Sequence, residues 1–207
     1  MSGSTHPTGK GAPDVFHHTA IAVKDVNRSH QFYTEVMGFK LRKVVKRQAP
    51  GGGWTKHIFY SNGDEPGFFA IWDLHGLEDA GVPDDSWQGG LSTGVGLPYW
   101  VNHIAFECHD IGSLEEHKQR WLDRGYHVLE VKHEFIHSIY TRDPDGTLVE
   151  FTYDTVPLTE EDTLEAIELM ADDTPASVPE YEGIVHKSEH AKARKQAERI
   201  ADASAAH

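Results

Sequence analysis

The chain has 207 residues, 38% of them hydrophobic, and carries 33 acidic against 19 basic residues, a formal net charge of −14. This composition is typical of a globular protein of one or two domains, and no apolar run approaches the roughly 18 residues that span a membrane. The negative charge repels phosphate backbones, so neither nucleic acid nor a membrane is an expected partner.

The first segment, residues 1–14, has no hydrophobic core, so we expect a disordered leader rather than a secretory signal. The single cysteine, Cys108, allows no intrachain disulfide, which is consistent with a reducing compartment. A cytoplasmic location is therefore expected.

Two later segments, residues 18–41 and 103–129, repeat one pattern. Three residues recur 85 positions later: His18 as His103, Ala20 as Ala105 and Asp25 as Asp110. Each copy reads as an alternating strand, an aspartate at a helix start, an amphipathic helix and a glycine that ends it. The repeat indicates an internal duplication.

Three further strands are predicted after each helix, because alternating runs are bounded there by turn residues. They cover residues 40–48, 54–61 and 67–74 in the first copy and 127–134, 137–143 and 147–153 in the second. The predicted fold class is α+β, with two βαβββ modules at residues 15–75 and 101–154. Residues 76–100, rich in Gly, Pro and Asp, are expected to form a linker that covers the cavity.

Residues 155–207 are expected to form a helical C-terminal extension. A threonine cap and an acidic first turn predict one helix within residues 158–173, and the alanine-rich, charged residues 188–207 predict another. A solvated helix is the simpler interpretation of this tail, and docking on a partner subunit is the alternative.

One histidine of each module is expected to face a cavity. Alternate side chains of a strand share a face, so His18 lies with Ala20. His17 takes the bulkier face, which is expected to pack on the helix or meet solvent. His103 lies with Ala105 in the same way.

Glu150 stands in the middle of the last predicted strand, where a buried carboxylate is costly unless it is paired or bound to a metal. Together with His18 and His103 it makes a 2-His-1-carboxylate set with open coordination positions. Fe(II) is typical of such a set, and Mn, Co, Ni and Zn also accept these ligands. A strand histidine can also be an ordinary core or surface residue, and the repeat is what favours the metal site.

Three stretches of the chain resemble the vicinal oxygen chelate superfamily of glyoxalases, extradiol dioxygenases, fosfomycin-modifying enzymes and bleomycin-resistance proteins: HHTAIAVKDVNRSHQFYTEVMGFKL, NHIAFEC and IYTRDPDGTLVEF. The resemblance covers about residues 15–154. It implies a cupped mixed sheet around a divalent metal held by His18, His103 and Glu150, and a homodimer.

The position that the repeat relates to Glu150 falls near Trp72, which is not a carboxylate. In this respect the chain is more similar to the three-ligand extradiol enzymes than to a four-ligand glyoxalase. The neighbouring Asp73 leaves a shift of register open.

The resemblance also suggests residues that could act on the substrate. Tyr140, ten residues before Glu150, resembles the tyrosine that extradiol dioxygenases place beside the substrate, although a packing role is equally open. His133 resembles a histidine that hydrogen-bonds the substrate or oxygen in these enzymes, but the spacing is shorter here and an exposed loop histidine is the alternative. His57 could line the pocket, and a structural role is equally open. Gly67 stands where the acid–base histidine of these enzymes is usual, so His133 or His57 would have to move protons instead.

A neighbouring histidine, His137, is expected to be exposed in a loop.

These features predict a metal-dependent oxidoreductase, with Fe(II) as the expected metal, that uses O2 to cleave a catecholic or related aromatic small molecule. One alternative is a glyoxalase- or epimerase-like enzyme that works through a metal-bound enediolate. Another is a non-catalytic binding protein of the bleomycin-resistance type, which needs no metal. The sequence does not specify the natural substrate.

Overall fold

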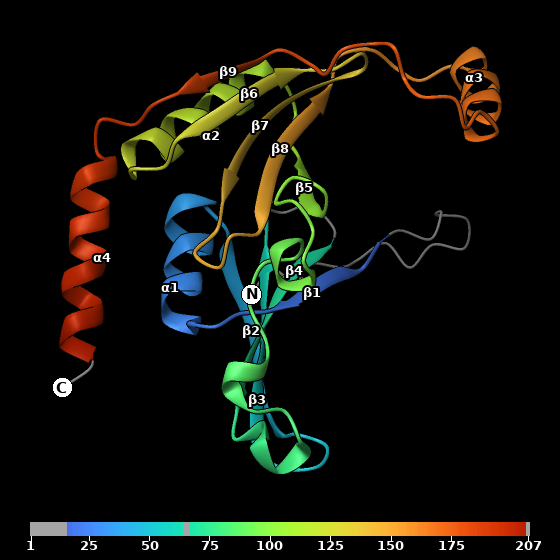
Figure 1. The fold of residues 1–207 in the computed structure, drawn as a ribbon. Coiled ribbons are helices and arrows are strands. Elements are labelled where there is room, and N and C mark those ends of the chain that lie inside the picture. The colour runs from blue at the N-terminus through green and yellow to red at the C-terminus, as the bar shows by residue number, and fades with distance from the viewer. Residues whose placement is uncertain (1–15, 64–66, 206–207) are drawn as a thin grey trace, which may run out of the picture. The chain divides into compact units, whose positions relative to one another are not determined.

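The computed structural model describes residues 16–63 and 67–205, so the predicted leader at residues 1–14 lies outside the described residues. The chain forms two compact units. One runs to Asn102 and includes Asp143–Thr147, and the other contains His103–Arg142 and the residues from Leu148 onward. Each unit is built on one sheet (Figure 1).

The first unit contains a four-stranded sheet in the order β1-β4-β3-β2. Its strands are β1 (His18–Ala22), β2 (Lys40–Gln48), β3 (Trp54–Ser61) and β4 (Phe68–His75). β1 is parallel to β4, and the other neighbours are antiparallel. Helix α1 (Val26–Gln31) and a π-helical turn (Phe32–Val36) connect β1 to β2.

Helix α1 begins at the aspartate that the sequence indicates. The Asp25 carboxylate accepts hydrogen bonds from the backbone N–H groups of Asn27 and Arg28, at 2.9 and 3.1 Å, which satisfies donors that a helix start leaves free. The helical segment stops before Gly38, whose φ of 81° is a left-handed conformation that glycine adopts without strain. Local sequence therefore fixes both ends of this connection.

One face of the first sheet is buried under the helical segment. The fully buried Tyr33 packs its ring on Phe69, with 4.3 Å between the ring centroids. Ile58 and Ile71 are buried on the same face, because alternate residues of a strand point the same way. His18 belongs to the opposite face.

A buried aspartate ties the Asp143–Thr147 turn to the first unit. The Tyr33 hydroxyl donates to Asp143 Oδ2 at 2.8 Å, and the backbone N–H groups of Asp145 and Thr147 donate to Oδ1. Burial raises the pKa of Asp143 to about 6, because these hydrogen bonds only partly offset the lost solvation.

The predicted linker contains three short 3-10 turns, at Leu77–Ala80, Asp84–Ser86 and Thr93–Val95. Lys24, just after β1, contacts this segment twice: its ammonium donates to the Asp84 carbonyl and lies 3.7 Å from the centroid of the Trp87 ring. These contacts hold part of the linker near the end of β1.

The second unit contains a five-stranded sheet in the order β5-β8-β7-β6-β9. The strands are β5 (His103–Glu107), β6 (Val128–Lys132), β7 (Ile136–Arg142), β8 (Leu148–Asp154) and β9 (Gly183–His186). β5 is parallel to β8, and the other neighbours are antiparallel.

Helix α2 (Ile111–Asp123) covers one face of the second sheet. It begins at a capping box in which the Asp110 carboxylate accepts from the Ser113 backbone and the Ser113 hydroxyl accepts from the Asp110 backbone. The helix buries Trp121 completely, 5.6 Å from the ring of Phe151 on β8. The predicted α+β class and both βαβββ modules are confirmed.

The C-terminal extension contains helices α3 (Glu160–Met170) and α4 (Ala191–Ala205), and α3 starts at the Thr159 cap. It also contains β9, which the sequence does not predict, because its four residues are held by pairing with the distant strand β6. In the ranges that the structure describes, no helix is both long and apolar enough to cross a membrane.

Glu130 on β6 joins β9 to the rest of the second unit. Its carboxylate accepts from Lys118 Nζ at 2.9 Å, His137 Nε2 at 2.8 Å and His186 Nε2 at 2.7 Å. His137 is 4% exposed, so the expectation of an exposed loop histidine is wrong. Burial alone would raise the pKa of Glu130, but these three donors lower it to about 2.

We predict that Glu130→Gln destabilises the protein in a pH-dependent way. A carboxylate whose pKa falls from 4.5 to about 2 on folding stabilises the fold above pH 4.5, and this contribution is lost as the pH falls towards 2. The variant should lose roughly 2–3 kcal/mol of unfolding free energy at pH 7 and less at pH 3, as measured by urea unfolding. Glu115 is an exposed carboxylate that also contacts Lys118, and Glu115→Gln should change the unfolding free energy little. Equal stability of Glu130→Gln and wild type at pH 7 would contradict the prediction.

Candidate metal centre

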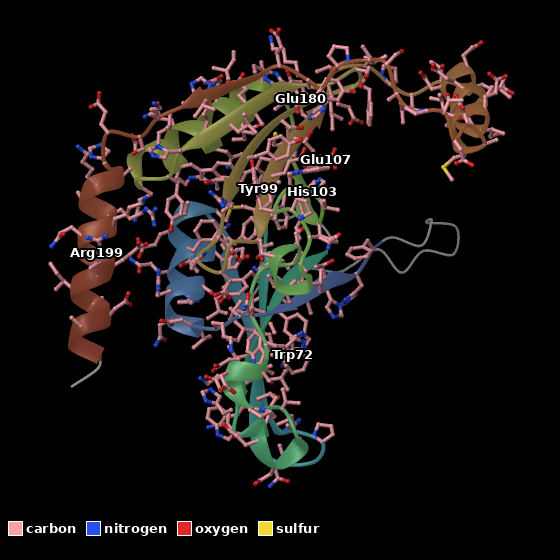
Figure 2. All side chains as sticks on the ribbon, in the orientation of Figure 1. Trp72, Tyr99, His103, Glu107, Glu180 and Arg199 are labelled. Atoms are coloured by element: carbon pink, nitrogen blue, oxygen red, sulfur yellow. The ribbon has the colours of Figure 1, made fainter. Side chains whose placement is uncertain are left out.

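Two of the three predicted ligands lie together in the second unit. His103 is the first residue of β5, and Glu150 is the third residue of β8. The parallel register pairs Ala105 with Glu150, so both predicted ligands are on the same face of the sheet. His103 Nε2 is 3.3 Å from Glu150 Oε2, and Figure 2 labels His103.

The Glu150 carboxylate is buried and incompletely satisfied. The residue is 2% exposed, and its Oε1 has no hydrogen-bond partner among the described residues. An ionised carboxylate in such a place is costly unless a cation or a donor compensates it. A divalent metal supplies that compensation, so His103 and Glu150 fit a metal site.

Tyr140 and His133 adjoin this pair. Tyr140 on β7 is directly opposite Glu150 in the antiparallel register, and its ring centroid is 6.3 Å from that of His103. The Tyr140 hydroxyl and His133 Nε2 are 2.9 Å apart. Burial, with the negative charge of Glu150, raises the pKa of Tyr140, so the phenol keeps its proton at neutral pH.

The third predicted ligand, His18, lies in the first unit. Its ring is 5.8 Å from His57 and 5.5 Å from Phe59. It also contacts His17, with the two Nδ1 atoms 2.8 Å apart, so the expected separation of these histidines onto opposite faces does not describe their rings. The reason is that β1 begins at His18, and strand alternation does not extend to the residue before it.

His57, whose ring lies beside that of His18, also has an unsatisfied polar atom among the described residues. Its Nε2 is buried and has no hydrogen-bond partner among the described residues. The ring stacks on Trp72 of β4, with 3.9 Å between centroids, and Figure 2 labels Trp72. Burial and then the nearby His18 lower the pKa of His57, which favours the neutral imidazole.

A cavity of about 300 Å³ in the first unit lies beside the alanines of β1. Ala20 and Ala22 line it together with Trp87 and Leu91 of the linker segment. Thr147 also lines it, and the buried hydroxyl of this residue has no partner among the described residues. The lining combines apolar side chains with the polar side chain of Gln88.

The register corrects one detail of the repeat. Ala20 pairs with Ala70 in the first sheet, as Ala105 pairs with Glu150 in the second, so the counterpart of Glu150 is Ala70 rather than a residue near Trp72. The first module therefore has no carboxylate at this position. Gly67, just before β4, has a φ of 102°, a conformation that disfavours a side-chain-bearing residue there.

The structure thus groups the predicted site residues in two sets. His103, Glu150, Tyr140 and His133 form one set in the second unit, and His18 and His57 form the other in the first. Over the ranges that the structure describes, no group of three or more His, Cys, Asp or Glu side chains is arranged to hold a metal ion.

The family model described as the Glyoxalase/Bleomycin resistance protein/Dioxygenase superfamily matches residues 15–151. The chain belongs to this superfamily. The predicted resemblance is therefore confirmed at the level of the superfamily. The matched region contains β1 to β7 and ends inside β8, one residue after Glu150, so the C-terminal extension lies outside it.

Several solved structures are similar in fold. A glyoxylase/bleomycin resistance protein/dioxygenase domain from Frankia sp. EAN1pec is 18% identical, covering 69% of this chain and 99% of that one with a TM-score of 0.48. FosX, a fosfomycin resistance protein from Listeria monocytogenes, is 20% identical over 73% and 98%, with a TM-score of 0.45. A lactoylglutathione lyase from Agrobacterium tumefaciens is 21% identical over 68% and 94%, with a TM-score of 0.43. No curated protein matches the sequence.

Sequence reasoning missed some neighbours of these residues. Phe59 and Phe68 surround His18 and His17, and strand alternation places them on the same sheet face as His18. Tyr181, from the C-terminal extension, contacts His133. Alternation could have indicated the two phenylalanines, but no local signal indicates Tyr181.

We predict that Glu150→Gln stabilises the metal-free protein. The amide removes a buried charge whose Oε1 has no partner, so the unfolding free energy at pH 8 in the presence of a chelator should rise by about 1–3 kcal/mol. Chemical denaturation measures this change, and Glu78→Gln, an exposed carboxylate of the linker segment, is the matched control. A less stable Glu150→Gln protein would show that the carboxylate is already compensated without a metal.

Proposed function

We propose that this protein is a divalent-metal-dependent dioxygenase that cleaves the ring of a catecholic or related aromatic substrate, with Fe(II) as its metal. The observation that carries the proposal is the buried Glu150 carboxylate: one oxygen lies 3.3 Å from His103 Nε2, and the other has no hydrogen-bond partner in the described part of the chain. Burying such a carboxylate without a compensating cation is costly, which favours a metal site over a metal-free pocket.

The proposed ligands are His18, His103 and Glu150. The repeat supports His18, because His18 and His103 are each the first residue of the first strand in their module. Ala70 at the position equivalent to Glu150 supports a three-ligand set, because the first module offers no carboxylate there. Two histidines and one carboxylate leave coordination positions open for substrate and O2.

Bound Fe(II) would polarise the adjacent oxygens of the substrate and exchange electrons between substrate and O2. In the overall reaction one ring C–C bond breaks and two C–O bonds form. Both atoms of O2 enter the product, and the ring supplies all four electrons, so no external reductant is needed. The active site then has to orient the substrate and move protons.

Tyr140 and His133 are suited to orienting the substrate and moving protons. Burial raises the pKa of Tyr140, so its hydroxyl stays protonated and can donate a hydrogen bond to a substrate oxygen. His133 Nε2, 2.9 Å from that hydroxyl, can return the proton or accept one. This pair could take the acid–base role of the histidine that extradiol dioxygenases usually carry at the sequence position of Gly67.

The first unit supports an aromatic substrate. The His18 face of its sheet carries Phe59, Phe68 and the stacked pair of His57 and Trp72. Flat rings on a sheet face favour a flat ligand, because aromatic pairs gain from offset and edge-to-face contacts. Burial lowers the pKa of His57 in this group, which favours the neutral imidazole.

Oxygen consumption tests the reaction class. Protein purified without oxygen and loaded with Fe(II) should consume one O2 per molecule of a substituted catechol and form a yellow ring-opened product. The same protein with the hemithioacetal of methylglyoxal and glutathione is the comparison for a glyoxalase-like activity. Full iron occupancy without O2 uptake on any catechol of the panel would contradict the dioxygenase.

Metal retention tests the ligand set separately. His18→Ala, His103→Ala and Glu150→Ala should each lower retained iron from about one ion per chain to below ~0.1, because three ligands are few enough that each is required. His17→Ala is the matched control and should keep its iron. A ligand variant that retains stoichiometric iron would remove that residue from the set.

A further inference from the structure

The C-terminal extension returns to the second unit after leaving it. Strand β9 pairs antiparallel with β6, with Leu129 opposite Val185 and Glu130 opposite Ile184. His186 at the end of β9 is within 2.7 Å of the Glu130 carboxylate. Backbone pairing and this hydrogen bond therefore anchor a segment that the family model does not include.

Tyr181 comes two residues before β9 and contacts the loop between β6 and β7 at two points. Its ring lies edge-on to the ring of His133, with 4.5 Å between centroids. Its hydroxyl donates a hydrogen bond to the carboxylate of Glu134, the next residue of the loop. Strand β9, which begins two residues later, holds this part of the chain beside β6.

Tyr181 restricts the rotation of the His133 side chain. Its backbone N–H donates to the carbonyl of Ile136 at 2.9 Å, which closes the turn between the strands, and its Nε2 meets the hydroxyl of Tyr140. A histidine in a loop can rotate about its side-chain bonds. The Tyr181 ring occupies one side of the imidazole and so restricts that rotation.

We propose that Tyr181 is a positioning residue of the candidate site: it keeps His133 Nε2 on the Tyr140 hydroxyl, next to Glu150. The C-terminal extension thereby becomes part of the site. The positioning of His133 is inferred from contacts within the second unit alone. The expected effect on turnover rests on the proposed function. Tyr181 is 49% exposed, so its ring contributes little to the core, and a role limited to packing does not explain these contacts.

Two substitutions separate the ring from the hydroxyl. Tyr181→Phe keeps the ring beside His133 and removes only the hydrogen bond to Glu134, whereas Tyr181→Ala removes both. Ile184→Ala is the matched control. Ile184 is an exposed residue of β9, and its side chain points to the other face of the sheet from that of Val185.

The first measurement is of the histidine ring. Nitrogen-15 NMR of histidine-labelled full-length protein, with His133 assigned through His133→Gln, should show one tautomer for wild type, Tyr181→Phe and Ile184→Ala. Tyr181→Ala should show averaged ring signals, because the imidazole is free to turn. Unchanged His133 signals in Tyr181→Ala would overturn the proposal.

The second measurement is of turnover in the Fe(II)-loaded protein with a catechol. Tyr181→Ala should lower kcat by about 10- to 100-fold, with KM changed less than about threefold and iron content unchanged, whereas Tyr181→Phe stays close to wild type. Freed ring signals with unchanged kcat would overturn the role in the site. If the iron-loaded wild type consumes no O2, the proposed function fails, and the ring signals alone still decide whether Tyr181 positions His133.

Discussion

A carboxylate buried in the middle of a sheet is costly unless a cation or a donor compensates it, and Glu150 is such a carboxylate. On one face of β8 its Oε2 lies 3.3 Å from His103 Nε2, and the residue pairs with Tyr140 of β7. On the other face of the same strand, Val149 and Phe151 form the fully buried core beneath α2. Strand alternation lets a single strand present polar chemistry to one side and an apolar core to the other.

The two units carry different kinds of side chains at the candidate site residues. The first carries rings on the face of His18, a neutral His57 and a cavity next to small β1 side chains, all of which favour binding of a flat organic molecule. The second carries the unsatisfied carboxylate and the Tyr140–His133 pair, which favour metal binding and proton transfer. The C-terminal extension adds a strand to the second unit and a tyrosine to that pair.

The features that could be predicted from the sequence are those with a local pattern. Alternation, capping residues and the 85-residue repeat indicate both modules and the shared face of His103 and Glu150. The counterpart of Glu150 was misplaced near Trp72, because the loops of the two modules differ in length and the repeat offset is not constant along them. His137 is buried beside Glu130 of the neighbouring strand β6, and β9 pairs with that same strand from more than 50 residues further along the chain, so these contacts follow from strand pairing rather than from a local pattern.

The proposed ligand set of His18, His103 and Glu150 is tested most directly by anomalous diffraction from crystals of the iron-loaded protein. The account predicts a single strong peak at the iron absorption edge, bonded to an imidazole nitrogen of each histidine and to a carboxylate oxygen of Glu150. An iron peak bonded to other side chains, or one that leaves Glu150 uncoordinated, would contradict it.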